Sequence, residues 1–289
     1  MEIKTIGFIG TGVMGRSMAG HLIDAGFKLK VYNRTKEKAL SLLDKGAVWA
    51  ASPKEAADDV DLVISIVGYP QDVKEVWLGE NGALQSMKQG SIGIDMTTST
   101  PSLAKEMTKE GLKRGVTICD APVTGGDVGA RNGTLTILFG GSAKAFLDLE
   151  PVFKAMGKNY VRFGESGSGQ YAKICNQIAI AAGMMSVCEA LITARKTGLD
   201  EELVLKTLSG GAAGSFSLSS YGPRILKGDF NPGFYVKHFV KDMKIAIDVA
   251  KECNLKLPGL ELALKLYEKL IEQGDGDLGT QALFKLYLS

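Results

Sequence analysis

A glycine-rich turn near the start of the chain restricts its fold more than any other feature. Residues 4–9 form a short, largely apolar run of the kind that makes a buried parallel strand. The run leads into the pattern Gly-x-Gly-x-x-Gly, which consists of Gly10, Thr11, Gly12, Val13, Met14 and Gly15. In a dinucleotide-binding turn the first glycine makes the bend, the second admits a pyrophosphate, and the third lets helix and strand pack closely. We predict a strand, this turn, a helix to about residue 25 and a second strand over residues 28–32.

The end of that second strand bears on which dinucleotide is bound. A carboxylate at this point binds the ribose 2′-hydroxyl of NAD, whereas an arginine accommodates the 2′-phosphate of NADP. This chain has Asn33, Arg34 and Thr35 here, and no carboxylate. The planar guanidinium of Arg34 suits a phosphate. The sequence therefore favours NADP, with NAD possible, unless Arg34 is only a surface residue at the start of the next helix.

Strand-like and helix-like segments alternate through the first half of the chain. The expected strands lie at residues 60–67, 91–95, 116–120, 134–139 and 159–163. The expected helices lie at residues 36–43, around 73, from 102 onward and at 144–156. This alternation predicts an α/β fold with a doubly wound parallel sheet, a Rossmann-like arrangement.

The strand pattern disappears beyond residue 164. The remainder of the chain has a helical pattern, with helices expected at residues 201–208, 236–253 and 259–273. We therefore predict an NADP-binding Rossmann-like domain over residues 1–164 and an all-helical C-terminal domain over residues 165–289, joined by a long helix.

One long apolar segment opens the predicted C-terminal domain. Residues 170–194 come after a Gly-Ser-Gly turn and contain no proline and a single glycine. A helix of about 25 residues extends roughly 37 Å. Lys173, Asn176 and Gln177 lie at i, i+3 and i+4 and so share one face of this helix. Because a buried ammonium needs partners, the trio is either a solvated helix start or part of a binding site.

Another glycine-rich loop comes after the strand expected to end at Asp120. It contains Thr124, Gly125 and Gly126. Glycines can turn several backbone N–H groups toward one point, which makes a nest that binds anions. The alternative is a purely structural turn.

Composition excludes several other classes of protein. The 289 residues are 45% hydrophobic with a net charge of +2, so the basic excess of a nucleic-acid-binding protein is missing. The longest apolar run, residues 178–188, is shorter than the ~20 residues of a membrane span. The four cysteines are scattered, without the spacing of a disulfide framework or a zinc site. We expect a cytoplasmic protein with no metal, membrane or nucleic-acid partner, and the first residues show no signal peptide.

Four separated motifs resemble those of the β-hydroxyacid dehydrogenases, the family of 3-hydroxyisobutyrate dehydrogenase, tartronate semialdehyde reductase and the plant glyoxylate and succinic semialdehyde reductases. Residues 7–15 resemble the family's cofactor motif, and residues 120–126 its substrate-binding motif, with Thr124 where serine is commoner. Residues 167–177 are similar to the catalytic segment, and residues 241–243 to the Lys-Asp-Leu/Met motif. The motifs stand in family order, and the resemblance covers essentially the whole chain.

The resemblance implies roles for individual residues. Lys173 corresponds to the family's catalytic lysine. The substrate-binding positions are Thr124, Gly125, Gly126, Asn176, Gln177, Phe234 and Asp242. The cofactor-binding positions are Gly10, Thr11, Gly12, Val13, Met14, Gly15, Asn33, Arg34, Thr35, Val67, Gly68, Thr98 and Lys241, of which Val67, Gly68 and Thr98 line the nicotinamide half. It also implies a homodimer or homotetramer.

The activity that this implies is hydride transfer between NADP(H) and a small β-hydroxyacid, semialdehyde or 2-oxo acid, of the glyoxylate or succinic semialdehyde reductase type. Gln177 stands where 3-hydroxyisobutyrate dehydrogenases have a second asparagine, and Val67-Gly68 replaces their Leu-Pro. Both differences weaken the case for 3-hydroxyisobutyrate as the substrate, and an NAD-dependent 3-hydroxyisobutyrate dehydrogenase is kept as the alternative. Two further alternatives are an imine reductase, a related class in which the catalytic lysine is typically replaced, and a non-catalytic NADP-binding protein. The presence of Lys173 argues against an imine reductase, and the intact set of motifs argues against a non-catalytic protein.

Overall fold

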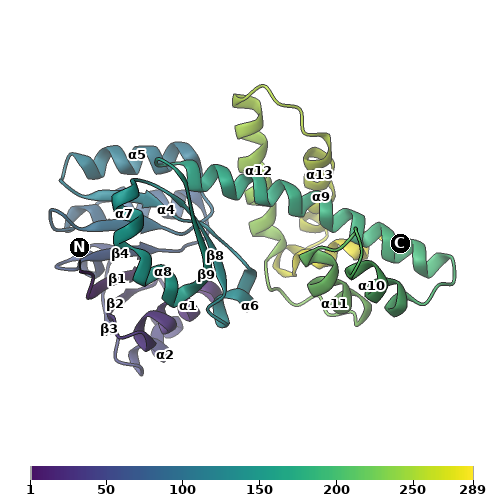
Figure 1. Ribbon diagram of the computed structural model, residues 1–289, viewed down its shortest axis with the longest axis horizontal. Coiled ribbons are helices and arrows are strands. Elements are labelled where there is room, and N and C mark those ends of the chain that lie inside the picture. Colours follow the sequence, from purple (N-terminus) through teal and green to yellow (C-terminus); the bar gives the residue numbers. More distant parts are fainter. Residues whose placement is uncertain (1, 289) are drawn as a thin grey trace. The chain divides into compact units, whose positions relative to one another are not determined.

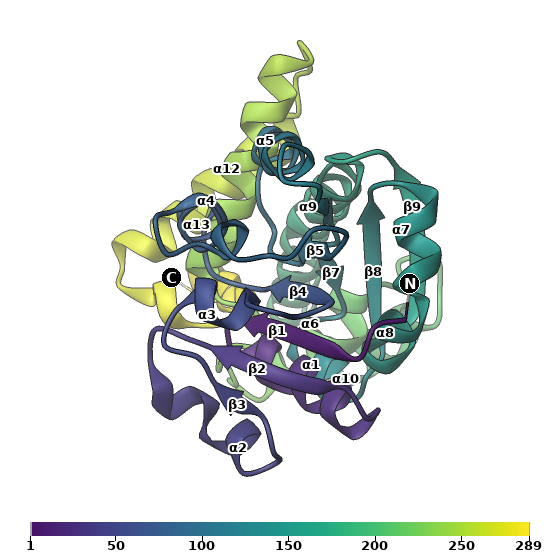
Figure 2. The same cartoon turned by 90° about the vertical axis from the view of Figure 1, so that its left-hand side faces the viewer.

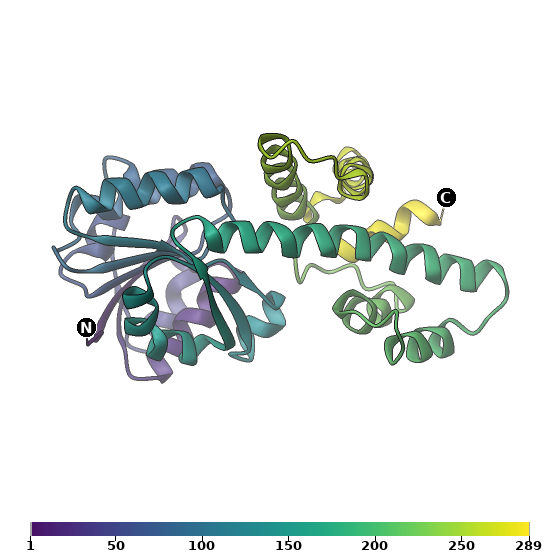
Figure 3. The ribbon, with the colours of Figure 1, turned by 45° about the horizontal axis from the view of Figure 1, so that its top comes forward.

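The computed structural model describes residues 2–288, and the chain divides into two compact units after Lys173. This division falls inside helix α9 (Ser168–Lys196), which runs without interruption in Figure 3. The domain boundary predicted at residue 164 precedes that helix and stays a prediction. One helix therefore supplies residues to both units.

A nine-stranded sheet forms the centre of the N-terminal unit within the described residues (Figure 2). Its strand order is β3-β2-β1-β4-β5-β6-β8-β7, with β9 also paired to β8. The first six strands are parallel, which confirms the predicted sheet, whereas β8 pairs antiparallel with β6 and β7. The strands are β1 (Thr5–Ile9), β2 (Lys28–Tyr32), β3 (Val48–Trp49), β4 (Leu62–Ser65), β5 (Ile92–Asp95), β6 (Thr117–Asp120), β7 (Val123–Thr124), β8 (Leu135–Gly140) and β9 (Gly157–Gly164).

Helices cover both faces of this sheet, because successive side chains of a strand point to opposite faces. Leu62 and Ile64 of β4 join the core that contains Met18 of α1, whereas Val63 joins the core that contains Trp77 of α4. The helices are α1 (Val13–Asp24), α2 (Leu40–Leu43), α3 (Pro53–Ala57), α4 (Pro70–Leu78), α5 (Pro101–Leu112), α6 (Gly126–Arg131), α7 (Ala143–Asp148) and α8 (Glu150–Met156), with 3₁₀ turns η1 (Lys36–Ala39) and η2 (Ala83–Gln85).

Several short elements differ from the sequence prediction. The single helix expected at residues 144–156 is two helices, α7 and α8, and Pro151 lies in the first turn of the second. Proline suits a first turn because its missing N–H is not needed there, so it starts a new helix. Strands β3 and β7 and helices α3 and α6 are too short to show a periodic pattern.

The C-terminal unit is helical, as predicted, and is built around one core (Figure 1). Met184 of α9, Met243 of α12, Tyr267 of α13 and Phe284 are buried together in it. Besides α9, its helices are α10 (Glu201–Ser209), α11 (Gly222–Leu226), α12 (Val236–Glu252) and α13 (Pro258–Glu272). Shorter turns are η3 (Ser217–Tyr221), η4 (Asp275–Asp277) and η5 (Thr280–Tyr287).

Helix α9 is, by length and composition alone, long and apolar enough to cross a membrane. Its most apolar window has a mean hydropathy of 1.5, and 44% of that window is buried within the protein. Ala181, Met184, Cys188 and Leu191 recur at helical spacing and pack into the C-terminal core. A core helix accounts for this composition, and the predicted absence of a membrane partner stays a prediction.

Five strand residues lie in one row across the parallel part of the sheet. Tyr32, Ile9, Ser65, Asp95 and Asp120 are consecutive register partners, each at or next to the carboxyl end of its strand. In an open α/β sheet, ligands bind at this edge. The segments that follow these strands carry the predicted cofactor residues other than Lys241, so the sheet brings these segments to a common edge.

Two carboxyl groups of this row, those of Asp95 and Asp120, are buried. The Ser65 hydroxyl donates to Asp95 Oδ1 at 2.7 Å, and the Thr97 amide donates to the same oxygen at 3.2 Å. Burial disfavours the charged form and raises the pKa of each carboxyl group to about 6. The neighbouring Asp120 charge also raises the pKa of Asp95.

The turn after β1 is packed tightly at two of its three glycines. Gly10 has φ +99°, and a Cβ on it would lie 2.1 Å from the carbonyl oxygen of Ile66. A Cβ on Gly15 would lie 1.9 Å from the carbonyl oxygen of Gly10, whereas one on Gly12 would meet nothing within 4 Å. The first and third glycines are therefore required by the fold, and the second is not.

We expect Asp95→Asn to change how stability depends on pH. The folded-state pKa of Asp95 is about 6 and its unfolded value is about 3.9, so between these values the unfolded state binds fewer protons. Its contribution is therefore fully present below about pH 4 and is lost as pH rises through about 6. From pH 4 to pH 7 the variant should gain about 2 kcal/mol relative to the parent. Urea unfolding followed by fluorescence of Trp49 and Trp77 measures this change, and a pH-independent difference would contradict it.

We expect Gly15→Ala to destabilise the N-terminal unit by about 1–3 kcal/mol, because its Cβ would overlap the Gly10 carbonyl. Gly12→Ala is the matched control, since Gly12 has an extended backbone with φ −69° and open space around it. Its unfolding free energy should stay within about 0.5 kcal/mol of the parent's. Tryptophan fluorescence in urea measures both, and equal losses would contradict the assignment.

Candidate functional site

The Gly10–Gly15 turn has space and an unpaired polar atom at its middle. Gly12 has open space around it, and Thr11 Oγ1 is buried with no hydrogen-bond partner among residues 2–288. Asn33 supports this turn, because its Oδ1 accepts the Thr11 amide at 3.1 Å and its amide group donates to the Thr35 carbonyl at 2.9 Å. The Asn33 side chain thus braces the turn, which its sequence position did not indicate.

Arg34 extends into solvent beside the end of β2. Its side chain is 80% exposed, and Nη1 donates to Asp72 Oδ1 at 3.1 Å. Asp72 also accepts the Tyr69 amide at 3.1 Å in the first turn of α4. An exposed ion pair of this kind is worth at most about 1 kcal/mol. An incoming phosphate can therefore replace Asp72 as the partner of Arg34. The pair between Arg34 and Asp72 was not predicted from the sequence.

The predicted nicotinamide positions lie in the segments after β4 and β5. Val67, Gly68 and Thr98 are half-buried. The two segments are joined, because the Val67 amide donates to Thr97 Oγ1 at 2.9 Å. Ser99 Oγ is buried and has no hydrogen-bond partner in the described chain. The two segments are therefore held together after the carboxyl ends of β4 and β5, and the Ser99 hydroxyl is left for a ligand to bind.

The glycine-rich loop predicted after Asp120 is more ordered than expected. Val123 and Thr124 form strand β7, in which Thr124 pairs with Thr136 of β8. Gly125 and Gly126 have φ of +125° and +63°, and α6 starts at the second of them. Positive φ values explain why glycines stand here. The Thr124 side chain is half-buried, and its role in binding an anion stays a prediction.

Lys173 lies near the start of α9, as the last residue of the N-terminal unit. Only 7% of the residue is exposed, so it is not the solvated lysine of a helix end. A buried ammonium is costly unless it has polar partners, and such positions are candidates for function.

In the C-terminal unit a polar network links four of the predicted residues. The Asn176 side-chain amide donates to Gln177 Oε1 at 2.7 Å, and Gln177 Nε2 donates to Asp242 Oδ2 at 2.7 Å. The Lys241 ammonium lies 2.7 Å from Asp242 Oδ1. Gln177 and Asp242 are buried, so this network fixes which way the Asn176 amide points. Phe234 instead packs on Phe239, with ring centroids 5.5 Å apart.

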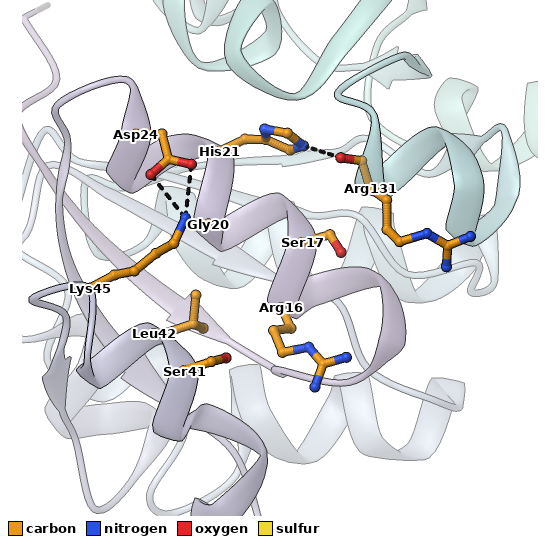
Figure 4. A pocket seen from close by; sticks show the side chains of 9 residues that line it. All are labelled: Arg16, Ser17, Gly20, His21, Asp24, Ser41, Leu42, Lys45 and Arg131. Carbon is orange, nitrogen blue, oxygen red and sulfur yellow. Dashed lines mark hydrogen bonds and ion pairs between the residues drawn. The ribbon is translucent and has the colours of Figure 1, made fainter.

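A surface pocket of about 420 Å³ lies beside α1 in the N-terminal unit (Figure 4). None of the predicted site residues lines it. Its residues come mainly from α1 and the α2 region and include Arg16, His21 and Lys45, and the Lys45 ammonium is paired with Asp24. Within residues 2–288, no group of three or more His, Cys, Asp or Glu side chains is placed to hold a metal ion.

The residues of the N-terminal unit fit a nicotinamide dinucleotide. The open backbone at Gly12 admits a pyrophosphate, and the first turn of α1 supplies N–H groups and a positive helix end. The unpaired hydroxyls of Thr11 and Ser99 are buried in loops that leave the same edge of the sheet. Arg34 can turn toward a phosphate at the end of β2 once Asp72 releases it.

Both halves of the chain match known family models. Residues 5–164 match the NAD binding domain of 6-phosphogluconate dehydrogenase. Residues 167–287 match the model described as NAD-binding of NADP-dependent 3-hydroxyisobutyrate dehydrogenase.

Individual proteins resemble the chain over nearly its full length. The uncharacterized oxidoreductase YkwC of Bacillus subtilis is 53% identical over 285 residues, 99% of both chains. The probable 3-hydroxyisobutyrate dehydrogenase-like 1, mitochondrial, of Arabidopsis thaliana is 53% identical over 96% of this chain and 83% of its own. The solved structure of Mycobacterium tuberculosis 3-hydroxyisobutyrate dehydrogenase with L-serine has a TM-score of 0.89 at 25% identity, with all of both chains covered. The chain therefore belongs to the β-hydroxyacid dehydrogenase family and is an NAD(P)-dependent oxidoreductase that acts on CH–OH groups.

Proposed function

We propose that this enzyme is an NADPH-dependent reductase of a small semialdehyde or 2-oxo acid, of the glyoxylate or succinic semialdehyde reductase type. The observation that carries the proposal is the edge formed by the row from Tyr32 to Asp120. The glycine turn, Arg34, the predicted nicotinamide segments and the Thr124 loop all come after strands of this row or lie beside it. Lys173 belongs to the same unit and is buried.

The preference for NADPH is supported by the side chains at the end of β2. Arg34 is exposed and there is no carboxylate in the sequence Asn33-Arg34-Thr35. The nearby Asp72 carboxylate pairs with Arg34 and would lose that partner to a 2′-phosphate. NAD-dependent activity would need neither Arg34 nor this exchange, so removal of the Arg34 side chain should distinguish the two cofactors.

The chain's own residues supply binding and proton transfer. Bound NADPH supplies the hydride. Lys173 gives a proton to the carbonyl oxygen as negative charge develops there, and in the reverse direction it accepts the proton of the alcohol. Thr124, with the Gly125 and Gly126 amides, binds the substrate carboxylate. Asn176, fixed by Gln177, helps to position the substrate.

A second candidate is a 3-hydroxyisobutyrate dehydrogenase that uses NAD. The names of the Arabidopsis relative and of the Mycobacterium structure support the 3-hydroxyisobutyrate part of this candidate. Initial rates distinguish the two candidate functions. They are measured with glyoxylate and with succinic, tartronate and methylmalonate semialdehydes, each with NADPH and with NADH. The proposal requires NADPH to be preferred and glyoxylate or succinic semialdehyde to react best. A preference for methylmalonate semialdehyde with NADH would support the second candidate. Cytoplasmic location and assembly as a homodimer or homotetramer remain predictions.

We expect Arg34→Ala to raise the KM for NADPH by about 10- to 100-fold, because a hydrogen bond to a charged group is worth about 1.5–3 kcal/mol. The KM for NADH should change by less than about threefold, since NADH lacks the phosphate. Steady-state kinetics with both cofactors measures this difference.

Asp72→Asn is the matched control for Arg34→Ala. It keeps an acceptor for the Tyr69 amide but removes the charge that holds Arg34. The KM for NADPH should be unchanged or lower, as Arg34 is then released to the phosphate. Equal effects of Arg34→Ala on NADPH and NADH would overturn the assignment.

We expect Lys173→Ala to lower kcat by about 10²- to 10⁴-fold, the range for a positioned general acid. NADPH affinity measured by calorimetry should change little, because the groups that hold NADPH are elsewhere. Lys173→Arg should also be impaired, since a guanidinium retains the charge but does not readily release a proton. Normal turnover in Lys173→Arg would show that charge alone suffices, and normal turnover in Lys173→Ala would remove Lys173 from the mechanism.

A further inference from the structure

The Gln170 side chain binds the backbone on both sides of Thr98. Its Oε1 accepts the Ser99 amide at 2.9 Å, and its Nε2 donates to the Thr97 carbonyl at 2.8 Å. Gln170 is fully buried, so both hydrogen bonds are shielded from water. Thr97 in turn accepts the Val67 amide through its hydroxyl group. A single side chain of α9 therefore holds the segment that carries one predicted nicotinamide residue and, through Thr97, contacts the segment that carries two others.

The same turn of α9 is also fixed by a carboxyl group from the sheet. Asp120 Oδ1 accepts the Gly167 amide at 2.6 Å, and Asp120 Oδ2 accepts the Gln170 amide at 2.8 Å. These amides lie at the helix start, where N–H groups have no partner within the helix. Asp120 thus acts as the N-cap of α9 although it lies 47 residues before Gly167.

Close packing at the helix start makes this attachment rigid. A Cβ on Gly169 would lie 2.3 Å from the Leu138 carbonyl oxygen, and one on Gly140 would lie 2.6 Å from the Gly169 nitrogen. Backbone therefore contacts backbone where α9 meets β8. Lys173 comes three residues after Gln170, on the same face of the helix.

We infer that Gln170 is a positioning residue for hydride and proton transfer, which sets the place of Lys173 relative to the Thr97–Ser99 segment beside the nicotinamide. The inference rests on the proposed function, in which Lys173 transfers the proton. Gln170 touches backbone on each side of Thr98 and precedes Lys173 by about one helical turn. Loss of its two hydrogen bonds would release the Thr97–Ser99 segment from α9, while Asp120 would still hold the start of the helix. The segment could then move relative to the lysine.

Gln170→Met tests the hydrogen bonds with little change in side-chain volume. Gln170→Glu keeps an acceptor for the Ser99 amide but has no donor for the Thr97 carbonyl. Val152→Ala is the control for general destabilisation, because Val152 is fully buried on α8 and distant in sequence from both attachments. Asp120→Asn tests the second attachment, since its amide group would face one of the two helix N–H groups.

Hydrogen exchange of the cofactor-free protein, measured by mass spectrometry, tests the attachment without any turnover. In Gln170→Met the Ser99 amide should exchange at least about tenfold faster, while the backbone amides of residues 167 and 170 stay protected by Asp120. In Asp120→Asn the backbone amide of residue 167 or 170 should exchange faster, while the Ser99 amide stays protected by Gln170. Val152→Ala should leave all three amides protected. Unchanged exchange at Ser99 in Gln170→Met would overturn the attachment.

Kinetics then tests the positioning role. In Gln170→Met, kcat should fall about 10- to 100-fold, because small displacements of reacting groups have effects of this size. NADPH affinity by calorimetry should stay within about threefold, and Gln170→Glu should recover part of kcat. Val152→Ala should lower the urea midpoint and keep the parent kcat. A role in stability alone would give Gln170→Met and Val152→Ala the same kcat, which overturns the inference.

Lys173→Ala measured in parallel separates this inference from the proposed function. Low kcat in Lys173→Ala with normal kcat in Gln170→Met overturns the positioning role and leaves the proposed function in place. Normal kcat in Lys173→Ala overturns the assignment of proton transfer to Lys173 in the proposed function, and the positioning role with it. Low kcat in both, with fast exchange at Ser99, supports both.

Discussion

The rest of the site in the N-terminal unit depends on two hydrogen bonds, in which backbone N–H groups at the start of α9 donate to the buried carboxyl group of Asp120. Gly167 stands just before the helix and has no side chain to cap it, so the cap comes from the end of β6. A cap from a neighbouring residue would complete the helix and nothing more. A cap from the sheet also fixes the helix to the edge at which the cofactor-binding loops begin. Lys173 is therefore held in place by the sheet and by its own helix.

This arrangement lowers stability at neutral pH. Asp95 and Asp120 are register partners at the ends of neighbouring strands, and burial raises the pKa of both to about 6. Ionising them at neutral pH opposes folding, because the charged form is poorly solvated there. The oxygens are nevertheless needed as acceptors for Ser65, Thr97, Gly167 and Gln170. Destabilised groups of this kind concentrate at functional sites, and here they organise the backbone around the site.

The sequence was sufficient where the signal is local, and it was insufficient where contacts join distant residues. The glycine turn, the alternating strands and the long apolar helix each have a periodic or steric pattern, so the doubly wound sheet and α9 were predicted correctly. The sequence analysis missed the division into α7 and α8, because a single proline is a weak signal for a new helix. It also missed the antiparallel pairing of β8, because the direction of a strand leaves no pattern in its residues. The contacts of Asn33 with the turn, of Arg34 with Asp72 and of Gln170 with Ser99 depend on residues 22 to 71 positions away. Asp120 at a strand end before a glycine-rich turn was a signal that could have been used, whereas nothing local distinguishes Gln170 from a solvated glutamine.

Two glutamines of α9 fasten this helix, one in each unit. Gln170 binds the segment after β5, and Gln177 binds Asp242 of α12. They are seven residues apart, about two turns of helix, and therefore lie on the same face. Lys173 comes after Gln170 in the N-terminal unit, and Asn176 comes just before Gln177 in the C-terminal unit. Each of the two residues expected to act on the substrate therefore lies near a glutamine that fixes its part of the helix.

The second of these glutamines stands where the 3-hydroxyisobutyrate dehydrogenase motif has an asparagine. A glutamine at position 177 reaches Asp242 through one more methylene group than asparagine has. The longer side chain binds the carboxylate and at the same time accepts the Asn176 amide. Gln177 therefore joins the Asn176 amide to the Asp242 carboxylate in this chain.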